Sequence, residues 1–186
     1  MIGEPTMAPR APRFHQDNAD VLVFTFKEGL LSAIAHDLKI RVTRFAIEVD
    51  DETKVIDARL DPTSLRVVTA MKNGAEAPGA LSDSDKRKIE QHIVDDVLHA
   101  KKFPEIRFVS TSLGEDDATG YRVRGQLTLH GQTHELAFVS RTDGEGQVAE
   151  IKIDQPRFAI PPFSAMLGTL KIKPEVLVRV ALPGAL

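Results

Sequence analysis

The sequence predicts a mostly β fold, an antiparallel barrel of about eight strands with one amphipathic α-helix. Two observations predict it. Eight or more segments alternate apolar and polar residues with period two, and turn-forming residues separate most neighbouring segments. The second observation is that a single stretch has the apolar spacing of three to four residues that is typical of a helix. A barrel of about eight strands is either filled by side chains or encloses one small ligand, so the interior decides the function.

The stretch 121–138 predicts the β-hairpin around which the other strands are organised. Leu127 and Leu129 share one face while the residues between them are polar, and Leu136 and Phe138 share a face after the turn. We place the turn at residues 131–133, with Leu129 near Leu136, because this register makes the two apolar faces coincide. A slip of one residue would expose the apolar set to water.

The remaining strands are predicted from the same alternation, at 21–26, 38–42, 45–50, 55–60, 64–69, 105–112, 148–153, 170–173 and 175–182. In the first of them Leu22, Phe24 and Phe26 share a face, which we predict to be buried. Prolines at 156, 161 and 162 predict an irregular or edge segment near Phe158 and Phe163, because proline cannot donate to a ladder.

We expect a single domain. A chain of 186 residues with 42% hydrophobic content buries one sizeable core without division into two. Residues 1–20 contain three prolines and no apolar run, which predicts a mobile N-terminal arm, so the barrel is assigned to residues 21–186. The apolar run 30–35 is compatible with a helical turn or with a second buried piece.

The predicted helix begins at Ser82. This residue is placed as an N-cap, with Asp85 three positions on as a weaker form of the capping box. An apolar stripe then faces inward, while Lys86 and Glu90 face water, and Phe103 with Pro104 ends the helix. We expect the helix to lie on the barrel or across one of its ends. The stripe consists of Ile89, Ile93, Val94, Val97 and Leu98.

Composition excludes several classes of function. Lys and Arg total 24 against 27 Asp and Glu, so there is no positive field to attract a phosphate backbone, and nucleic-acid binding is disfavoured. The sequence has no cysteine, which excludes disulfides, thiolate metal sites and cysteine nucleophiles. Residues 1–20 hold no apolar run long enough for a signal-peptide core or a membrane span, so we expect a cytoplasmic protein with no membrane span.

The histidines and serines give no clear catalytic or metal site. His130 and His134 are four apart, but across a hairpin turn this spacing guarantees no common face, so no metal is predicted. His36 and Asp37 open a strand where the barrel rim is expected; they either contact a ligand head group or form a turn with a partly exposed rim residue. No serine lies in a Gly-x-Ser-x-Gly elbow, so no catalytic residue is assigned.

Two segments resemble the YceI-like family. Residues 102–113, KFPEIRFVSTSL, resemble its aromatic-Pro-x-Ile-x-Phe-x-Ser strand, and residues 121–133, YRVRGQLTLHGQT, resemble its Gly-x-Leu-Thr-Leu-His-Gly-x-Thr hairpin. The resemblance implies a lipocalin-like barrel that holds a long-chain isoprenoid or another amphiphilic lipid, in a bacterial homodimer that is often periplasmic. The sequence departs from the family near Ser32, which lacks the usual preceding histidine, and at 157–166, which replaces an Asp-Phe-Gly sequence.

We therefore hypothesise a non-enzymatic carrier that encloses a polyisoprenoid, quinone-like or fatty amphiphile, needs no cofactor and acts in transport, storage or sequestration. His36 and His130 are expected to contact the head group. Phe158, Phe163 and Met166 are expected near the rim. The residues expected to line the interior are Phe24, Phe26, Leu38, Ile40, Phe45, Phe108, Leu127, Leu129, Leu136 and Phe138.

Two other functions remain compatible with the sequence. The first is a filled barrel that acts as a stress-related interaction module or a dimerising scaffold; a structure without a continuous internal cavity would favour it. The second is a hydrolase or isomerase that uses His36 with Asp37, which requires both side chains to meet in a pocket beside a nucleophile or a bound water.

Overall fold

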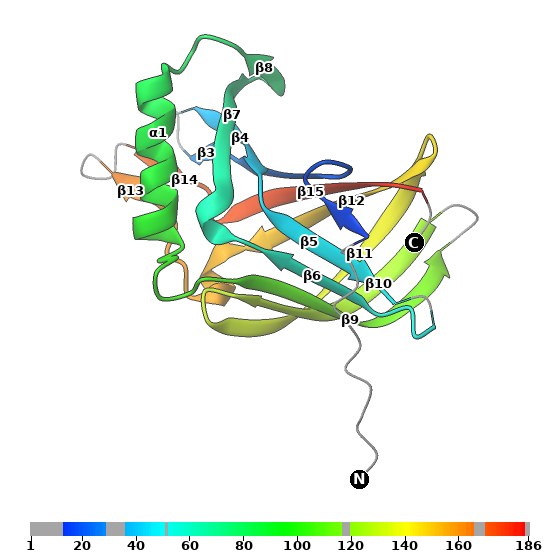
Figure 1. The fold of residues 1–186 in the computed structure, drawn as a ribbon. Helices are drawn as coiled ribbons and strands as arrows, with labels where there is room; N and C mark the ends of the chain where they lie inside the picture. The colour runs from blue at the N-terminus through cyan, green and yellow to red at the C-terminus, as the bar shows by residue number, and fades with distance from the viewer. Residues whose placement is uncertain (1–12, 29–35, 51, 117–119, 166–169, 185–186) are drawn as a thin grey trace.

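Twelve strands of the chain form one antiparallel sheet, in the order β1-β5-β6-β9-β10-β11-β12-β15-β2-β4-β7-β8 (Figure 1). The computed structural model describes residues 13–28, 36–50, 52–116, 120–165 and 170–184. The strands of the main sheet are β1 (Phe14–His15), β2 (Asp20–Thr25), β4 (Asp37–Val42), β5 (Phe45–Val49), β6 (Ile56–Leu60), β7 (Leu65–Lys72), β8 (Ala75–Ala77), β9 (Ile106–Asp116), β10 (Gly120–Leu129), β11 (Gln132–Asp143), β12 (Gly146–Asp154) and β15 (Glu175–Pro183). The mostly β, antiparallel class predicted from the sequence is confirmed.

A small second sheet lies at the end of the molecule near the helix. It has three strands in the order β13-β14-β3. They are β3 (Lys27–Glu28), β13 (Ser164–Ala165) and β14 (Leu170–Ile172). The segment 159–163, just before β13, forms no strand, as its prolines predict.

The main sheet curls because its topology requires it. β5 is second in the sheet order and β4 is third from the other end, yet only Thr43 and Arg44 join these two strands in the chain. The two ends of the sheet must therefore approach each other, and Figure 1 shows the resulting half-barrel. The strand count exceeds eight, because the segments predicted at 38–42, 45–50, 55–60 and 64–69 are all separate strands of the sheet, β4 to β7, and because the short strands β1 and β8 add to it.

The bend between β4 and β5 is fixed by hydrogen bonds to Ser64. This residue is fully buried and ends η1 (Pro62–Ser64), the one-turn 3-10 helix between β6 and β7. Its carbonyl oxygen accepts hydrogen bonds from the backbone N–H and the hydroxyl of Thr43, and its hydroxyl oxygen accepts one from the N–H of Arg44. The Arg44 guanidinium in turn pairs with Asp61 at 2.7 Å. These contacts hold the corner at which the sheet returns on itself.

The predicted hairpin is present with a shorter turn. Leu129 pairs with Gln132, so the turn consists of His130 and Gly131, both with positive φ, as in a type I′ turn. The placement of the turn at 131–133 with Leu129 near Leu136 is therefore wrong. The inference that the apolar faces coincide is correct, since Val123 pairs with Phe138 and Gly125 with Leu136.

The predicted helix is α1 (Asp83–His92), which continues as the π-helical turn η2 (Ile93–Val97). Ser82 is its N-cap and makes the predicted reciprocal capping box with Asp85. The helix ends before Phe103, because His99 adopts a positive φ of 46°. Lys86 and Glu90 were predicted to face water, but both side chains form hydrogen bonds to the sheet.

Both side chains attach the helix to β7. The Lys86 ammonium donates to the carbonyl oxygen of Val68 at 2.9 Å, and a Glu90 carboxylate oxygen accepts from the N–H of Val67 at 2.8 Å. Figure 1 shows α1, in green, beside β7 at one end of the half-barrel. The sequence could not reveal these bonds, since their partners are 18 and 23 residues apart in the chain.

The described part of the predicted N-terminal arm belongs to the barrel. Phe14 is buried in the core at 3% exposure and lies opposite Ile47 in the pairing of β1 with β5. A mobile arm beginning at residue 1 therefore does not extend to residue 20. The run 30–35 lies outside the described residues.

Gly125 allows β9 and β10 to approach closely. A Cβ at this position would overlap the carbonyl oxygen of Val109 and the ring of Phe108, whereas a Cβ at Gly114 in the same pair of strands would meet nothing within 4 Å. We expect Gly125→Ala to lower the free energy of unfolding by about 1–3 kcal/mol, because an overpacked site must displace its neighbours.

Urea denaturation monitored by circular dichroism measures this loss. Gly114→Ala is the matched control and is expected to leave the midpoint nearly unchanged. Equal midpoints for the two variants would contradict the close approach of β9 to β10.

Candidate ligand-binding cavity

The half-barrel encloses an apolar cavity of about 260 Å³. This volume lies just below the roughly 300–1,000 Å³ of most small-molecule sites. Strands from the whole circumference contribute to it. The strand residues that line it are Val21, Val23, Thr25, Ile40, Val42, Ile47, Ile56, Ala58, Leu60, Leu65, Ile106, Phe108, Val123, Leu127, Leu129, Leu136, Phe138, Ser140, Gln147, Ala149, Ile151, Ile153, Val176, Val178, Val180 and Leu182.

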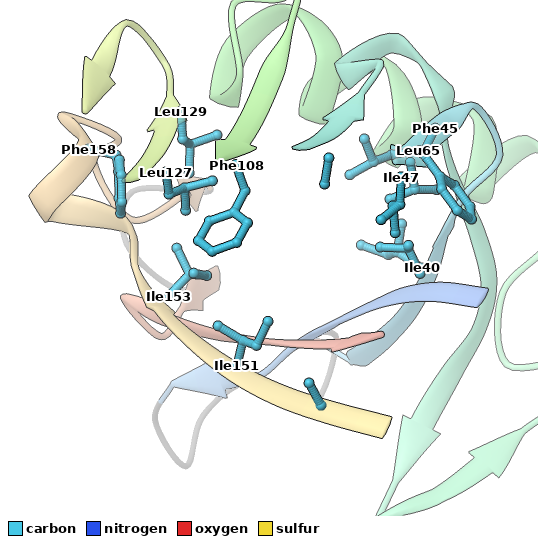
Figure 2. Packing of buried hydrophobic residues seen from close by; sticks show 14 of the residues in the cluster. Ile40, Phe45, Ile47, Leu65, Phe108, Leu127, Leu129, Ile151, Ile153 and Phe158 are labelled. Atoms are coloured by element: carbon cyan, nitrogen blue, oxygen red, sulfur yellow. The ribbon is translucent and has the colours of Figure 1, made fainter. Parts of the chain in front are cut away.

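Strand alternation aims these side chains inward. On β12, for example, Ala149, Ile151 and Ile153 are buried while the residues between them are exposed. Figure 2 shows Ile151 and Ile153 on one side of the interior and Ile40 and Ile47 on the other. Most of the facing side chains are aliphatic and of medium size, and they do not meet in the middle.

The helical segment closes part of the cavity. Ile93 and Val97 of η2, together with the following Leu98, contribute three apolar side chains to the lining. These residues belong to the stripe predicted from the sequence. Ile160 adds a fourth from the segment after η3 (Gln155–Phe158), where it is buried at 1% exposure. The expectation that the helix lies against the barrel is met.

Four polar residues reach the cavity: Thr25, Ser140, Gln147 and Gln155. Three of them have partners. The Ser140 hydroxyl donates to the side-chain oxygen of Gln147 at 3.0 Å, and the Gln155 amide donates to the carbonyl oxygens of Lys173 and Pro174. The Thr25 hydroxyl is the one buried side-chain polar atom in the described structure that has no hydrogen-bond partner.

Six of the ten residues predicted to line the interior do so: Ile40, Phe108, Leu127, Leu129, Leu136 and Phe138. Leu38 and Phe45 are buried in the core cluster beside the cavity without lining it. Phe158, predicted near the rim, is also in that cluster at 3% exposure. Of these phenyl groups, Phe108 and Phe138 therefore line the hollow, whereas Phe45 and Phe158 are buried without lining it.

Phe24 and Phe26 were predicted to line the cavity, and this is wrong. The inward side chains of β2 are Val21, Val23 and Thr25, so Phe24 lies on the outer face, opposite Leu177 of β15 and Lys39 of β4. Phe26 follows the end of β2 and does not line the cavity, and its carbonyl oxygen accepts a hydrogen bond from Lys173. Both faces of this strand are apolar, so only the pairing with its neighbours fixes which one is buried.

The remaining predicted contacts do not gather at the cavity. His36 is half-buried just before β4 and does not line it, and Asp37 accepts a hydrogen bond from the backbone N–H of Lys27 at 2.7 Å. Phe163 lies against the ring of His92, with centroids 5.9 Å apart. Met166 lies outside the described residues.

His130 is also absent from the cavity lining and belongs to a separate surface cluster at the hairpin turn. Its Nε2 lies 2.8 Å from Nδ1 of His99, its Nδ1 lies 3.1 Å from the carbonyl oxygen of Phe158, and its ring packs against Phe103. His134 is not part of this cluster, since its ring meets Phe158 edge-on. Sequence spacing provides no signal for His99, which is 31 residues from its partner.

Burial lowers the pKa of His130 below its ordinary 6.5, and the neighbouring charges of His99 and Lys102 act in the same direction, while the bond to Phe158 opposes them. The folded protein therefore favours neutral His130. No group of three or more His, Asp or Glu side chains is arranged to hold a metal ion in the part of the chain that the structure describes.

This cluster predicts a pH dependence of stability. Below pH 6.5 the unfolded chain protonates His130 while the folded protein resists protonation, so stability is full above 6.5 and falls as the pH drops toward the lowered pKa. His130→Asn removes the titrating group and keeps a turn, because Asn-Gly favours type I′. Urea midpoints measured above and below pH 6.5 should decrease less for this variant than for the wild type. An identical decrease in both proteins would contradict the role of His130.

None of the described helices is both long and apolar enough to cross a membrane. Solved structures of similar fold include BcnA of Burkholderia cenocepacia, with a TM-score of 0.62 and 15% identity over 90% of this chain and 96% of that one. A polyisoprenoid binding domain from Saccharophagus degradans has a TM-score of 0.56 and 11% identity over 90% and 95%. The YCEI protein of Campylobacter jejuni has a TM-score of 0.56 and 15% identity over 87% and 92%.

Curated relatives match a shorter region. A UPF0312 protein of Pseudomonas putida strain W619 is 38% identical over 65 residues, which is 34% of this chain and 34% of that protein. A UPF0312 protein of Shewanella oneidensis is 35% identical over 80 residues, or 42% of each chain. The matched region therefore spans less than half of these relatives. A family model described as the YceI-like domain matches residues 16–183, so this chain belongs to the YceI-like family.

Proposed function

We propose that this protein binds the chain of a long amphiphilic lipid, such as a polyisoprenoid, a quinone-like molecule or a fatty derivative, inside the half-barrel. The observation that carries the proposal is the cavity itself, which remains open among the inward side chains of the sheet and is almost entirely apolar. A filled barrel acting only as an interaction module would leave no such space.

The hydrophobic effect supplies the binding energy. Each methylene that moves from water into the cavity contributes about 0.8 kcal/mol, so a partly enclosed chain binds without any charged contact. A cavity of about 260 Å³ lined almost entirely by apolar side chains suits the hydrocarbon part of such a ligand. The name of the similar domain from Saccharophagus degradans, a polyisoprenoid binding domain, supports an isoprenoid as one candidate.

The chemistry of the lining favours holding a ligand over transforming it. Ser140, Gln147 and Gln155 are engaged with protein partners, and a catalytic site needs polar groups that converge on a reacting atom. His36 does not line the cavity, which removes the pairing that a hydrolase or isomerase would require there. We therefore propose a carrier, storage or sequestering role.

A substitution that fills the cavity tests the proposal. Ala149 lines the hollow at 5% exposure, whereas Ala137 lies on the outer face of β11. We expect Ala149→Phe to weaken binding of a fluorescent polyprenol at least tenfold, because the new ring occupies the space of the chain. Ala137→Phe is the matched control and should bind as the wild type does.

Organic extraction of purified protein followed by mass spectrometry gives an independent measurement. We expect a long-chain lipid from the wild type and from Ala137→Phe, and little from Ala149→Phe. Wild-type protein that releases no lipid and also fails to bind added polyprenol would contradict a lipid-binding role.

A further inference from the structure

We infer that the Thr25 hydroxyl holds the polar end of the bound amphiphile, and that it selects an uncharged head group, such as an alcohol, a carbonyl or a primary amide. This inference rests on the proposed function and adds to it the class of ligand and its direction in the cavity. It follows from the partners of the polar groups, the charge of the lining and the register of the strands.

Thr25 is the last residue of β2, and it contributes the unsatisfied hydroxyl of the cavity. The position opposite it on β4 is Leu38, which offers no hydrogen-bonding side chain. A buried hydroxyl without a partner destabilises the folded protein, because it has lost its hydrogen bonds to water and gained none. A bound ligand that supplies a donor or an acceptor at this point would recover that cost, so the hydroxyl favours such a ligand.

The other polar side chains of the cavity are not equivalent to Thr25. Gln147 both accepts from the Ser140 hydroxyl and donates to the Thr142 hydroxyl, at 3.0 and 2.9 Å. Gln155 directs its amide hydrogens to two backbone carbonyls. A head group placed against these residues would have to displace an existing bond, whereas Thr25 offers a new one.

The lining also sets the charge of the ligand. None of the lining residues in the described structure is Lys, Arg, His, Asp or Glu. A carboxylate or phosphate head buried there would lose its hydration without meeting a cation, which is strongly unfavourable. One hydroxyl, with one donor hydrogen and two acceptor lone pairs, matches a single neutral oxygen or amide.

The strand register gives the direction in which the hydrocarbon chain of the ligand lies in the cavity. Phe24 pairs with Leu177, so Thr25 lies level with the start of β15, whereas Gln147 pairs with Leu182 near its end. At about 3.3 Å per residue the two polar points are roughly 20 Å apart along the sheet. The head group therefore lies at the Thr25 end and the tail extends toward Ser140 and Gln147.

Thr25→Val tests the inference, because valine keeps the shape of threonine and removes the hydroxyl. Ligands of one chain length would be compared by displacement of a fluorescent probe: the alcohol, the primary amide, the carboxylic acid, the alkyl phosphate and the hydrocarbon without a head. Wild-type protein should bind the alcohol and amide roughly 5–10-fold more tightly than the hydrocarbon, as one hydrogen bond provides. The acid and phosphate should bind more weakly than the alcohol at neutral pH.

In Thr25→Val the preference for the alcohol over the hydrocarbon should disappear while hydrocarbon affinity stays as in the wild type. Thr25→Ser, which keeps the hydroxyl, should retain the preference, and Thr111→Val on the exposed face of β9 should change nothing. The ligand-free Thr25→Val protein should also unfold at a higher temperature than the wild type, because it buries no unsatisfied hydroxyl.

An unchanged preference for the alcohol in Thr25→Val, or tighter wild-type binding of the acid than of the alcohol, would overturn the inference while leaving lipid binding intact. Failure of wild-type protein to bind any of the ligands, the hydrocarbon included, would instead overturn the proposed function and the inference with it.

Discussion

The corner between β4 and β5 is the constraint on which the interior depends. Two residues join strands from opposite ends of the sheet order, and buried Ser64 receives three hydrogen bonds from them. At the same corner burial tends to raise the pKa of Asp61, but hydrogen bonds from Thr63 and Arg44 hold that pKa below its ordinary value. An open, flat sheet of the same strands would leave its apolar face exposed to water. The corner instead turns that face into the wall of a cavity.

The hollow persists because of where the large side chains lie. Phe24 lies on the outer face of the sheet, and Phe45 and Phe158 are buried without lining the cavity, so apart from Phe108 and Phe138 most of the lining consists of Val, Ile, Leu and Ala. Protein interiors otherwise pack as densely as organic crystals, and small residues at inward positions such as Ala58 and Ala149 leave space that neighbouring strands cannot move to fill. The hydrogen bonds of the ladders fix each strand to its neighbours, so the walls of the cavity cannot collapse inward.

Local patterns in the sequence predicted most of the fold and only part of the cavity. Alternation identified the inward face of β10, and the capping box at Ser82 located the helix. The inward face of β2 was predicted incorrectly, because apolar residues occupy both of its faces and the choice depends on pairing with β15 and β4. For the same reason the sequence did not show that Thr25 lines the cavity, or that His99 contacts His130 at a turn far away in the chain.

The helical segment differs from the strands in how it is held. None of the residues of α1 or η2 is fully buried, and hydrogen bonds from the side chains of Lys86 and Glu90 join this segment to the sheet. Moving a strand such as β12 aside would break a ladder of backbone hydrogen bonds along β15, but moving this segment would not. Unlike the strands that enclose the hollow, the π-helical turn is thus held without a backbone ladder, and its displacement would leave the hydrogen bonds of the sheet intact.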